Sequence, residues 1–155
     1  MFSFLKKNQF KVVACASGKC IPLSEVNDSV FSKKMMGDGF AIIPENEMIV
    51  SPVDGTIETV FPTKHAIGIK TKDGVEIILH IGLDTVNLNG EGFTSYVKAG
   101  DHVKAGQKVS CIDRQNLLDK GYDLSTMVIF TSGYEQEISL PCYNQEVKAG
   151  DVLIG

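Results

Sequence analysis

Two histidines and a threonine are spaced so that they can form one chemical site. His65 and His80 lie fifteen residues apart, and Thr63 precedes His65 by two residues. A neutral imidazole has an unprotonated ring nitrogen at physiological pH, so it can act as a nucleophile. A second imidazole can hydrogen-bond the anion that the first acquires. The pair therefore indicates one histidine that becomes phosphorylated beside another that stabilises the phosphate.

The elements that would bring these side chains together are the two strands of a hairpin. Asp73-Gly74 stands between two β-branched runs, and this dipeptide is a strong signal for a two-residue turn. If it forms the tip, Ile67 pairs with His80, and His65 becomes the diagonal neighbour of His80, about 7–8 Å away at the backbone. A three- or five-residue loop would change the parity and separate the histidines.

The same register assigns the hairpin residues to two faces, because side chains alternate along a strand. The site face would carry Thr63, His65, Ile67, Ile69, Glu76, Ile78 and His80. The face toward the core would carry Ala66, Gly68, Val75, Ile77 and Leu79.

Three further residues could belong either to the site or to turns. Gly82 lets the backbone approach the ring of His80, and its carbonyl could fix the tautomer. Asp84 would repel a phosphate, so it is either a rim residue that attracts a partner's arginine or a cap of the following turn. His102 is predicted to lie in an exposed turn and is assigned no role.

Composition narrows the class of protein. The 155 residues suffice for one domain, and the formal charge of −4 argues against nucleic acid as a partner. No apolar run approaches the ~20 residues of a membrane span, and the start lacks a signal peptide. The four cysteines show no CxxC spacing, so reduced thiols in a cytoplasmic protein are expected.

Short apolar runs separated by turn residues predict an all-β protein. We expect an antiparallel β-sandwich or barrel-like sandwich with one or two short helices, over 29–36 and 114–120. The predicted strands cover 10–14, 39–43, 48–51, 56–61, 65–71, 75–80, 108–112, 127–130 and 152–154.

The sequence also repeats itself in part. Residues 13–21 parallel residues 50–57, and Lys-Ala-Gly-Asp occurs at 98–101 and again at 148–151. This tetrapeptide predicts a tight turn in which glycine takes a positive φ and aspartate caps the backbone. Duplicated strand–turn–strand units are therefore expected.

Several of these segments resemble a known family. Ser51-Pro-Val-Asp-Gly-Thr-Ile, Phe61-Pro-Thr-Lys-His-Ala, residues 74–86 with His80-Ile-Gly-Leu-Asp, and Gly90-Glu-Gly-Phe are similar to the glucose-type enzyme IIA of the bacterial sugar phosphotransferase system. The resemblance runs from about Val12 to Gly155. It implies an antiparallel β-sandwich and a phosphotransferase activity through a phosphohistidine.

The resemblance implies a role for each site residue. His80 matches the histidine that accepts a phosphoryl group from the phosphocarrier HPr and passes it to a cysteine of the IIB domain of a membrane sugar permease. His65 matches the second active-site histidine, and Thr63 matches a hydroxyl close to it. The sugar itself is not bound by a protein of this kind.

The resemblance also implies a docking patch for both partners. Its apolar residues would be Val30, Phe31, Met35, Met36, Phe61, Ile78 and Val86, with Asp28 and Asp84 as an acidic rim. No cofactor is expected, because phosphoryl transfer between similar nitrogens needs positioning more than driving force. Zinc could bind His65 and His80 only if a partner added a carboxylate.

Residues 1–11 are predicted to be a short tail and 12–155 a single enzyme IIA domain, and Met1 favours a free-standing chain. An alternative function is a regulatory docking protein that is controlled by phosphorylation of His80. A biotinyl or lipoyl module is disfavoured because Met35-Met36 precede a glycine instead of a lysine. A zinc peptidase is disfavoured because the chain has no HxH at His80.

Overall fold

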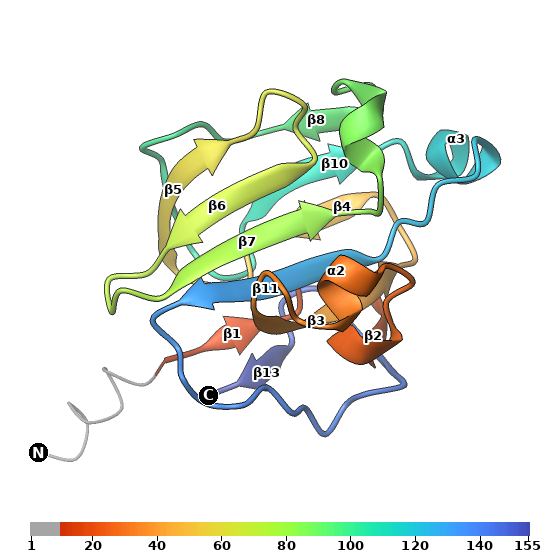
Figure 1. Ribbon diagram of the computed structural model, residues 1–155. Coiled ribbons are helices and arrows are strands. Elements are labelled where there is room, and N and C mark those ends of the chain that lie inside the picture. The colour runs from red at the N-terminus through yellow and green to blue at the C-terminus, as the bar shows by residue number, and fades with distance from the viewer. Residues whose placement is uncertain (1–9) are drawn as a thin grey trace, which may run out of the picture.

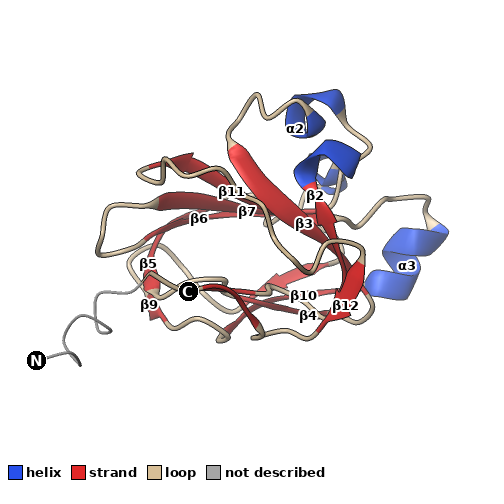
Figure 2. Cartoon of the chain, turned by 90° about the horizontal axis from the view of Figure 1, so that it is seen from below, coloured by secondary structure: helices blue, strands red, loops and turns tan. Residues whose placement is uncertain are grey.

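The chain folds into two facing layers of antiparallel β-strands (Figures 1 and 2). The structure is a computed structural model, and it describes residues 10–155. Most of the predicted tail, including its apolar residues Phe2 and Phe4, therefore lies outside the described residues. The predicted all-β sandwich with short helices is confirmed.

The larger layer is an eight-stranded sheet in the order β12-β2-β3-β11-β7-β6-β5-β9. The order β4-β10-β8 makes a three-stranded sheet, and β1 pairs with β13. The strand bounds are β1 Val12–Val13, β2 Gly18–Pro22, β3 Asp38–Pro44, β4 Met48–Val50, β5 Gly55–Val60, β6 Ala66–Lys70, β7 Glu76–Ile81, β8 Phe93–Ser95, β9 His102–Val103, β10 Lys108–Ile112, β11 Thr126–Ser132, β12 Gln145–Val147 and β13 Val152–Ile154.

The helices are short, as expected. α2 covers Ser29–Ser32 and α3 covers Arg114–Asp119, inside the two predicted segments. The 3-10 helices are η1 Leu23–Glu25 and η2 Thr85–Leu88. Figure 2 shows α2 outside the larger layer and α3 beside one edge of the sandwich. Within residues 10–155 no helix is long and apolar enough to cross a membrane.

The core fills the space between the layers. In β7, side chains alternate between half-buried and buried, and Ile77, Leu79 and Ile81 are almost completely buried. The other face of the larger sheet carries a second apolar cluster. Its members are Ile21, Leu23, Val26, Phe31, Ala41, Leu83, Met127 and Ile129. The two clusters bury both faces of the central strands, which makes these strands a rigid support.

The turn between β6 and β7 is one residue longer than predicted. The amide of Gly74 donates to the Thr71 carbonyl at 3.0 Å, and the amide of Thr71 donates to the Val75 carbonyl at 2.9 Å. Lys72, Asp73 and Gly74 therefore form a three-residue loop, with Gly74 at φ 85°. A type I turn followed by a left-handed glycine is the usual geometry of such loops.

The predicted pairing register is therefore wrong by one residue. Ala66, instead of Ile67, pairs with His80, and Gly68 pairs with Ile78. Ile67 and Ile69 consequently face the core, where both are at most 1% exposed. A one-residue shift exchanges the faces of a strand, so the small residues of β6, not its isoleucines, lie on the site face.

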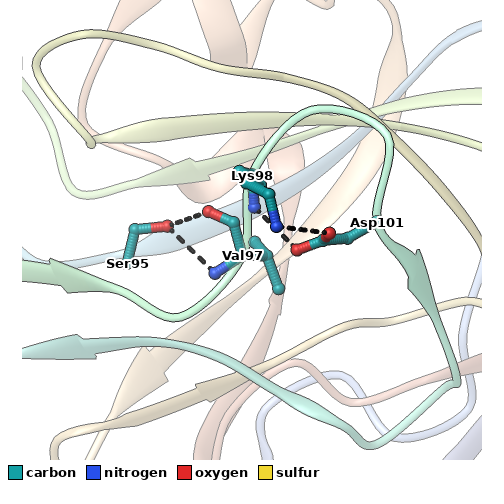
Figure 3. A network of polar contacts seen from close by, with 4 residues as sticks. All are labelled: Ser95, Val97, Lys98 and Asp101. Carbon is teal, nitrogen blue, oxygen red and sulfur yellow. Dashed lines mark hydrogen bonds and ion pairs between the residues drawn. The ribbon is translucent and has the colours of Figure 1, made fainter.

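The repeated turns are confirmed. In the turn at 98–101, Asp101 accepts from the amide of Lys98 at 2.9 Å and pairs with the Lys98 ammonium at 3.3 Å (Figure 3). In the second copy, Asp151 accepts from the amide of Lys148 at 2.8 Å. A related turn at 104–107 uses Gln107 in place of the aspartate, accepting from Lys104 at 3.1 Å.

The repeat extends to the hydrogen bonds around these turns. The amide of Gly150 donates to the Ala14 carbonyl at 2.9 Å, and the amide of Gly106 donates to the Ser51 carbonyl at 2.8 Å. Ala14 and Ser51 occupy matching positions in the two repeated segments. The duplicated strand–turn–strand units therefore hold their turns in the same way.

Four strands were not among the predicted runs. These are β2, β8, β9 and β12, which are short or interrupted by polar residues. His102, predicted to lie in a turn, is in β9, where its Nδ1 is 3.0 Å from the Thr56 hydroxyl. Pairing with neighbouring strands, not local sequence, defines such segments.

Gly39→Ala is expected to lower the free energy of unfolding by about 3 kcal/mol. A methyl group at Gly39 would collide with the Val128 carbonyl on the adjacent strand β11. Urea unfolding followed by circular dichroism would measure the loss. Gly74→Ala is the matched control: it meets open space and should cost only about 1 kcal/mol of backbone strain. Equal losses for the two variants would contradict the close packing of β3 against β11.

Candidate active site

His80 lies near the end of β7, on the outer face of the larger sheet. Ala66 is its partner on β6 and Met127 its partner on β11. The ring packs against the ring of Phe31 from α2, with centroids 4.9 Å apart. The small methyl of Ala66 leaves one side of the ring open to a neighbouring side chain. The site is thus a half-buried imidazole on a rigid strand.

A hydrogen bond to the backbone fixes the tautomer of His80. Its Nδ1 lies 2.9 Å from the carbonyl oxygen of Gly82. A carbonyl oxygen only accepts, so Nδ1 carries the proton and Nε2 holds the free electron pair. This is the contact expected of Gly82 from the sequence, and it leaves Nε2 as the nitrogen that could act as a nucleophile.

The backbone at Gly82 requires glycine. Its φ is 82°, and an added methyl carbon would lie 2.6 Å from the Thr85 side chain. The amide of Gly82 donates to the Ser125 carbonyl at 3.1 Å, and the Thr85 hydroxyl donates to the Ile81 carbonyl at 2.6 Å. These bonds hold the peptide that orients the His80 ring.

His65 contacts His80 although the hairpin register differs from the predicted one. The two ring centroids are 5.0 Å apart, edge to face. His65 precedes the first residue of β6 and follows Lys64, whose φ is 60°. The alternation of side chains along a strand therefore does not determine which way the His65 side chain points. The prediction that a longer loop would separate the two histidines is wrong.

Thr63 and Phe61 hold the ring of His65. The Thr63 hydroxyl is 2.6 Å from Nδ1 of His65, and the Phe61 ring meets it edge-on at 5.5 Å. The backbone carbonyl of His65 accepts from the amide of Ile81 at 2.7 Å. His65 is 5% exposed, so its ring has little freedom. The structure thus brings together the three residues that the sequence singled out.

Burial keeps both imidazoles neutral. It lowers the pKa of His80 to about 4, and the neighbouring His65 acts in the same direction. The hydrogen bond to Gly82 and the carboxylates of Asp28 and Asp84 oppose this shift. Burial also lowers the pKa of His65. At neutral pH the Nε2 of His80 therefore holds a free electron pair.

Two residues of the predicted docking patch contact the histidines, because the Phe31 ring packs against His80 and the Phe61 ring against His65. Val30, Met35, Met36, Phe61 and Val86 are exposed, and Ile78 is half-buried two residues before His80. Phe31 differs, since it is 8% exposed and forms part of the wall of the site. Ala66 and Gly68 belong to the site face but were missed, because the predicted register turned them inward. The sequence signal that could have found them is a pair of small residues at alternate positions of the strand that pairs with His80 and Ile78.

Two acidic residues occupy the positions just before the helices beside the site. Asp28 begins α2 and accepts from the amide of Val30 at 2.9 Å. Asp84 precedes η2 with φ 59°, and its carboxylate makes no capping hydrogen bond. It is exposed. The interpretation of Asp84 as a side-chain cap is therefore wrong, whereas that of a rim residue is consistent with its position.

Within the described residues no three histidine, cysteine, aspartate or glutamate side chains are placed to hold a metal ion. His65 and His80 offer two nitrogens where structural zinc takes four ligands. His102 lies on a different strand, β9, at the edge of the sheet. It is not part of the site.

Comparison with known proteins places the chain in a family. Residues 10–136 match the family described as phosphoenolpyruvate-dependent sugar phosphotransferase system, EIIA 1. The chain belongs to this family, whose function is that of a phosphocarrier in sugar phosphotransfer. The recognition drawn from the sequence motifs is confirmed, and so is the assignment to a phosphoryl-transfer system.

Similar proteins include both separate and fused forms. The chain is 46% identical to the PTS system glucose-specific EIIA component of Mycoplasma capricolum over 97% of this chain and 96% of that protein. It is 44% identical to the glucose-specific EIICBA component of Staphylococcus saprophyticus over 87% of this chain but only 20% of that protein. The solved structure of glucose permease IIA from Mycoplasma capricolum matches with a TM-score of 0.87 at 45% identity, covering 95% of both chains.

The His80 ring is expected to titrate near pH 4, well below the ~6.5 of an unperturbed histidine. Because the folded state binds protons less readily than the unfolded chain, stability should fall as pH decreases from about 6.5 to about 4. NMR titration of the ring gives the pKa, and urea unfolding across this range gives the slope. His80→Gln should flatten that slope. A His80 ring that titrates near 6.5 would contradict the burial argument.

Proposed function

We propose that His80 accepts a phosphoryl group on Nε2 from phospho-HPr and passes it to a cysteine of a IIB domain, in the cytoplasm. The observation that supports this most directly is the hydrogen bond from Nδ1 to the Gly82 carbonyl, which leaves Nε2 as the free nitrogen. Family membership supports the reaction, and the fused EIICBA relatives support a IIB partner.

The proposed step exchanges one nitrogen–phosphorus bond for another. The lone pair of His80 Nε2 attacks phosphorus as the bond to the donor's nitrogen breaks, and the donor leaves as a neutral imidazole after taking up a proton. The proton on Nδ1 of His80 remains bonded to the Gly82 carbonyl, which supports the positive charge that develops on the ring. In the second step a cysteine thiolate of the acceptor attacks phosphorus, and His80 leaves.

His65 is proposed to hold the phosphoryl oxygens. If the Thr63 hydroxyl donates to Nδ1 of His65, Nε2 of His65 carries the proton and can donate a hydrogen bond. The ring lies 5.0 Å from that of His80, so a phosphoryl group on His80 would be within its reach. A fixed donor in a partly buried site stabilises developing negative charge without reorganisation.

The apolar surface around the histidines is proposed as the docking site for both partners. Val30, Met35 and Val86 are 41%, 71% and 49% exposed although their side chains are apolar. Asp84 is also exposed, with no capping hydrogen bond. Apolar contacts with an acidic rim suit a partner that presents apolar residues and an arginine.

Phosphorylation of the wild-type chain by enzyme I, HPr and phosphoenolpyruvate should add one acid-labile, base-stable phosphate. His80→Ala should lose it, because the accepting nitrogen is removed. His65→Ala should keep it but transfer it slowly to a IIB domain, because the phosphate loses its donor. Intact mass spectrometry and a transfer assay measure the two steps, with His102→Ala as the matched control.

The outcomes separate the candidate roles. Absence of phosphate on the wild-type chain, or its retention in His80→Ala, would contradict the assignment of His80. Phosphorylation without transfer to any IIB domain would favour the regulatory docking protein instead.

Asp84→Asn should slow association with HPr about threefold at low salt and have little effect at high salt, because the exposed charge acts by attraction over a distance. Stopped-flow or surface plasmon resonance measures the rate. Asp73→Asn at the hairpin tip is the matched control, since it removes the same charge at the far end of the hairpin. Equal effects of the two substitutions would contradict a specific rim role for Asp84.

A further inference from the structure

Two cysteine sulfurs lie side by side at one edge of the sandwich. Sγ of Cys142 is 3.5 Å from Sγ of Cys20, although 122 residues separate them in the chain. Cys20 is on β2 and completely buried, whereas Cys142 is half-buried in the turn 141–144 before β12. Both thiols are free. A covalent link between them would therefore close a long loop.

The backbone fixes the two sulfurs near each other. The amide of Asn144 donates to the Cys20 carbonyl at 2.6 Å, and Gln145 is the partner of Cys20 in the pairing of β12 with β2. The amide of Gln145 donates to the Cys142 carbonyl at 3.0 Å, which closes the turn that carries Cys142. A disulfide bond is about 2.0 Å long, so the sulfurs must approach by roughly 1.5 Å. Cys142 lies outside the strands, where such a shift disturbs no strand pairing.

The other two cysteines lack this arrangement. Cys15 is completely buried, which suits a thiol that acts as a small apolar side chain. Cys111 is half-buried on β10, and its sulfur lies 4.0 Å from the carbonyl oxygen of Ile112. Packing alone explains Cys15, but it does not explain a half-exposed thiol in contact with a buried one.

We propose that Cys20 and Cys142 form a reversible disulfide when the protein meets a low-molecular-weight disulfide. The thiolate of Cys142 attacks one sulfur of the small disulfide, which gives a mixed disulfide and releases one small thiolate. Cys20 then loses its proton and attacks the Cys142 sulfur, and the second small thiolate leaves. The two protein thiols are oxidised by two electrons in total, and the small disulfide is reduced to two thiols.

The order of the two attacks follows from exposure. Cys142 is the thiol that a solute can reach, and Cys20 is covered by the core. Burial raises the pKa of the Cys20 thiol, and the neighbouring Cys142 acts in the same direction. Because the thiolate is the attacking species, closure of the disulfide should be faster at higher pH.

The thiol pair and the histidines lie on opposite faces of the larger sheet. Cys20 belongs to the core between the layers, whereas its neighbour Ile21 belongs to the outer cluster that includes Phe31. Phe31 in turn contacts His80. Oxidation is therefore expected to leave phosphorylation of His80 within about twofold of that of the reduced protein, since additive behaviour is usual for separated sites.

Oxidised glutathione is the probe for the test. In the wild-type chain it should remove two hydrogens, protect two of the four thiols from alkylation and join the Cys20 and Cys142 peptides. Cys20→Ala should instead accumulate one glutathionyl group on Cys142. Cys111→Ala is the matched control and should form the disulfide normally. The oxidised wild-type chain should melt about 5 °C or more higher, and dithiothreitol should reverse this.

If all four thiols of the folded wild-type chain can still be alkylated after treatment with oxidised glutathione, the proposal is overturned. A disulfide that includes Cys111, or that joins two chains, would overturn it as well. Peptide mapping of the wild type alone distinguishes these outcomes from the expected one, even if Cys20→Ala does not fold. A phosphorylation assay on the same oxidised sample tests the proposed role of His80 independently. Failure of the disulfide proposal can then be told from failure of the proposed function.

Discussion

The hydrogen bond between Nδ1 of His80 and the carbonyl of Gly82 is the contact on which the proposed chemistry of this protein depends. It fixes which nitrogen is free, and it requires a peptide that turns back toward the ring immediately after β7. Only a residue tolerant of φ 82° can supply that turn without striking Thr85. The surrounding bonds of Ile81 and Gly82 hold the geometry, so the end of one central strand sets the reactivity of the site.

Burial and nearby negative charges act in opposite directions on the pKa of His80. Apolar contacts with Phe31 and the nearby ring of His65 lower the pKa of His80, while Asp28 and Asp84 act against this without overcoming it. A neutral imidazole therefore lies near acidic residues, and in the proposed function the acidic residues attract a basic partner. The acidic charges lie at helix starts, outside the ring contacts, so the proposed docking of a basic partner would leave the free nitrogen of His80 in place.

Much of the fold could be predicted from the sequence, since the apolar runs at 108–112 and 152–154 coincide with β10 and β13. The turns around Gly100 and Gly150 were also predictable, because the aspartate that caps each turn lies in the same tetrapeptide as the glycine. The hairpin register was not, because Asp-Gly fits both a two-residue turn and the last positions of a three-residue loop. His65 lies beside His80 as expected, but the cause is the backbone bend at Lys64 and not the predicted hairpin register. The close approach of Cys20 and Cys142 could not be predicted, since it arises from pairing between distant strands.

The pairing of β1 with β13 brings two distant parts of the chain together, with Val12 opposite Ile154. Residues 10 and 155 are adjacent as well, because a methyl carbon added at Gly155 would lie 2.6 Å from the Phe10 carbonyl. A tether attached near either of these positions would leave the domain from the same spot on its surface. The domain is therefore suited to circular permutation through a short connecting loop, with new ends opened at an exposed turn such as the one around Gly100.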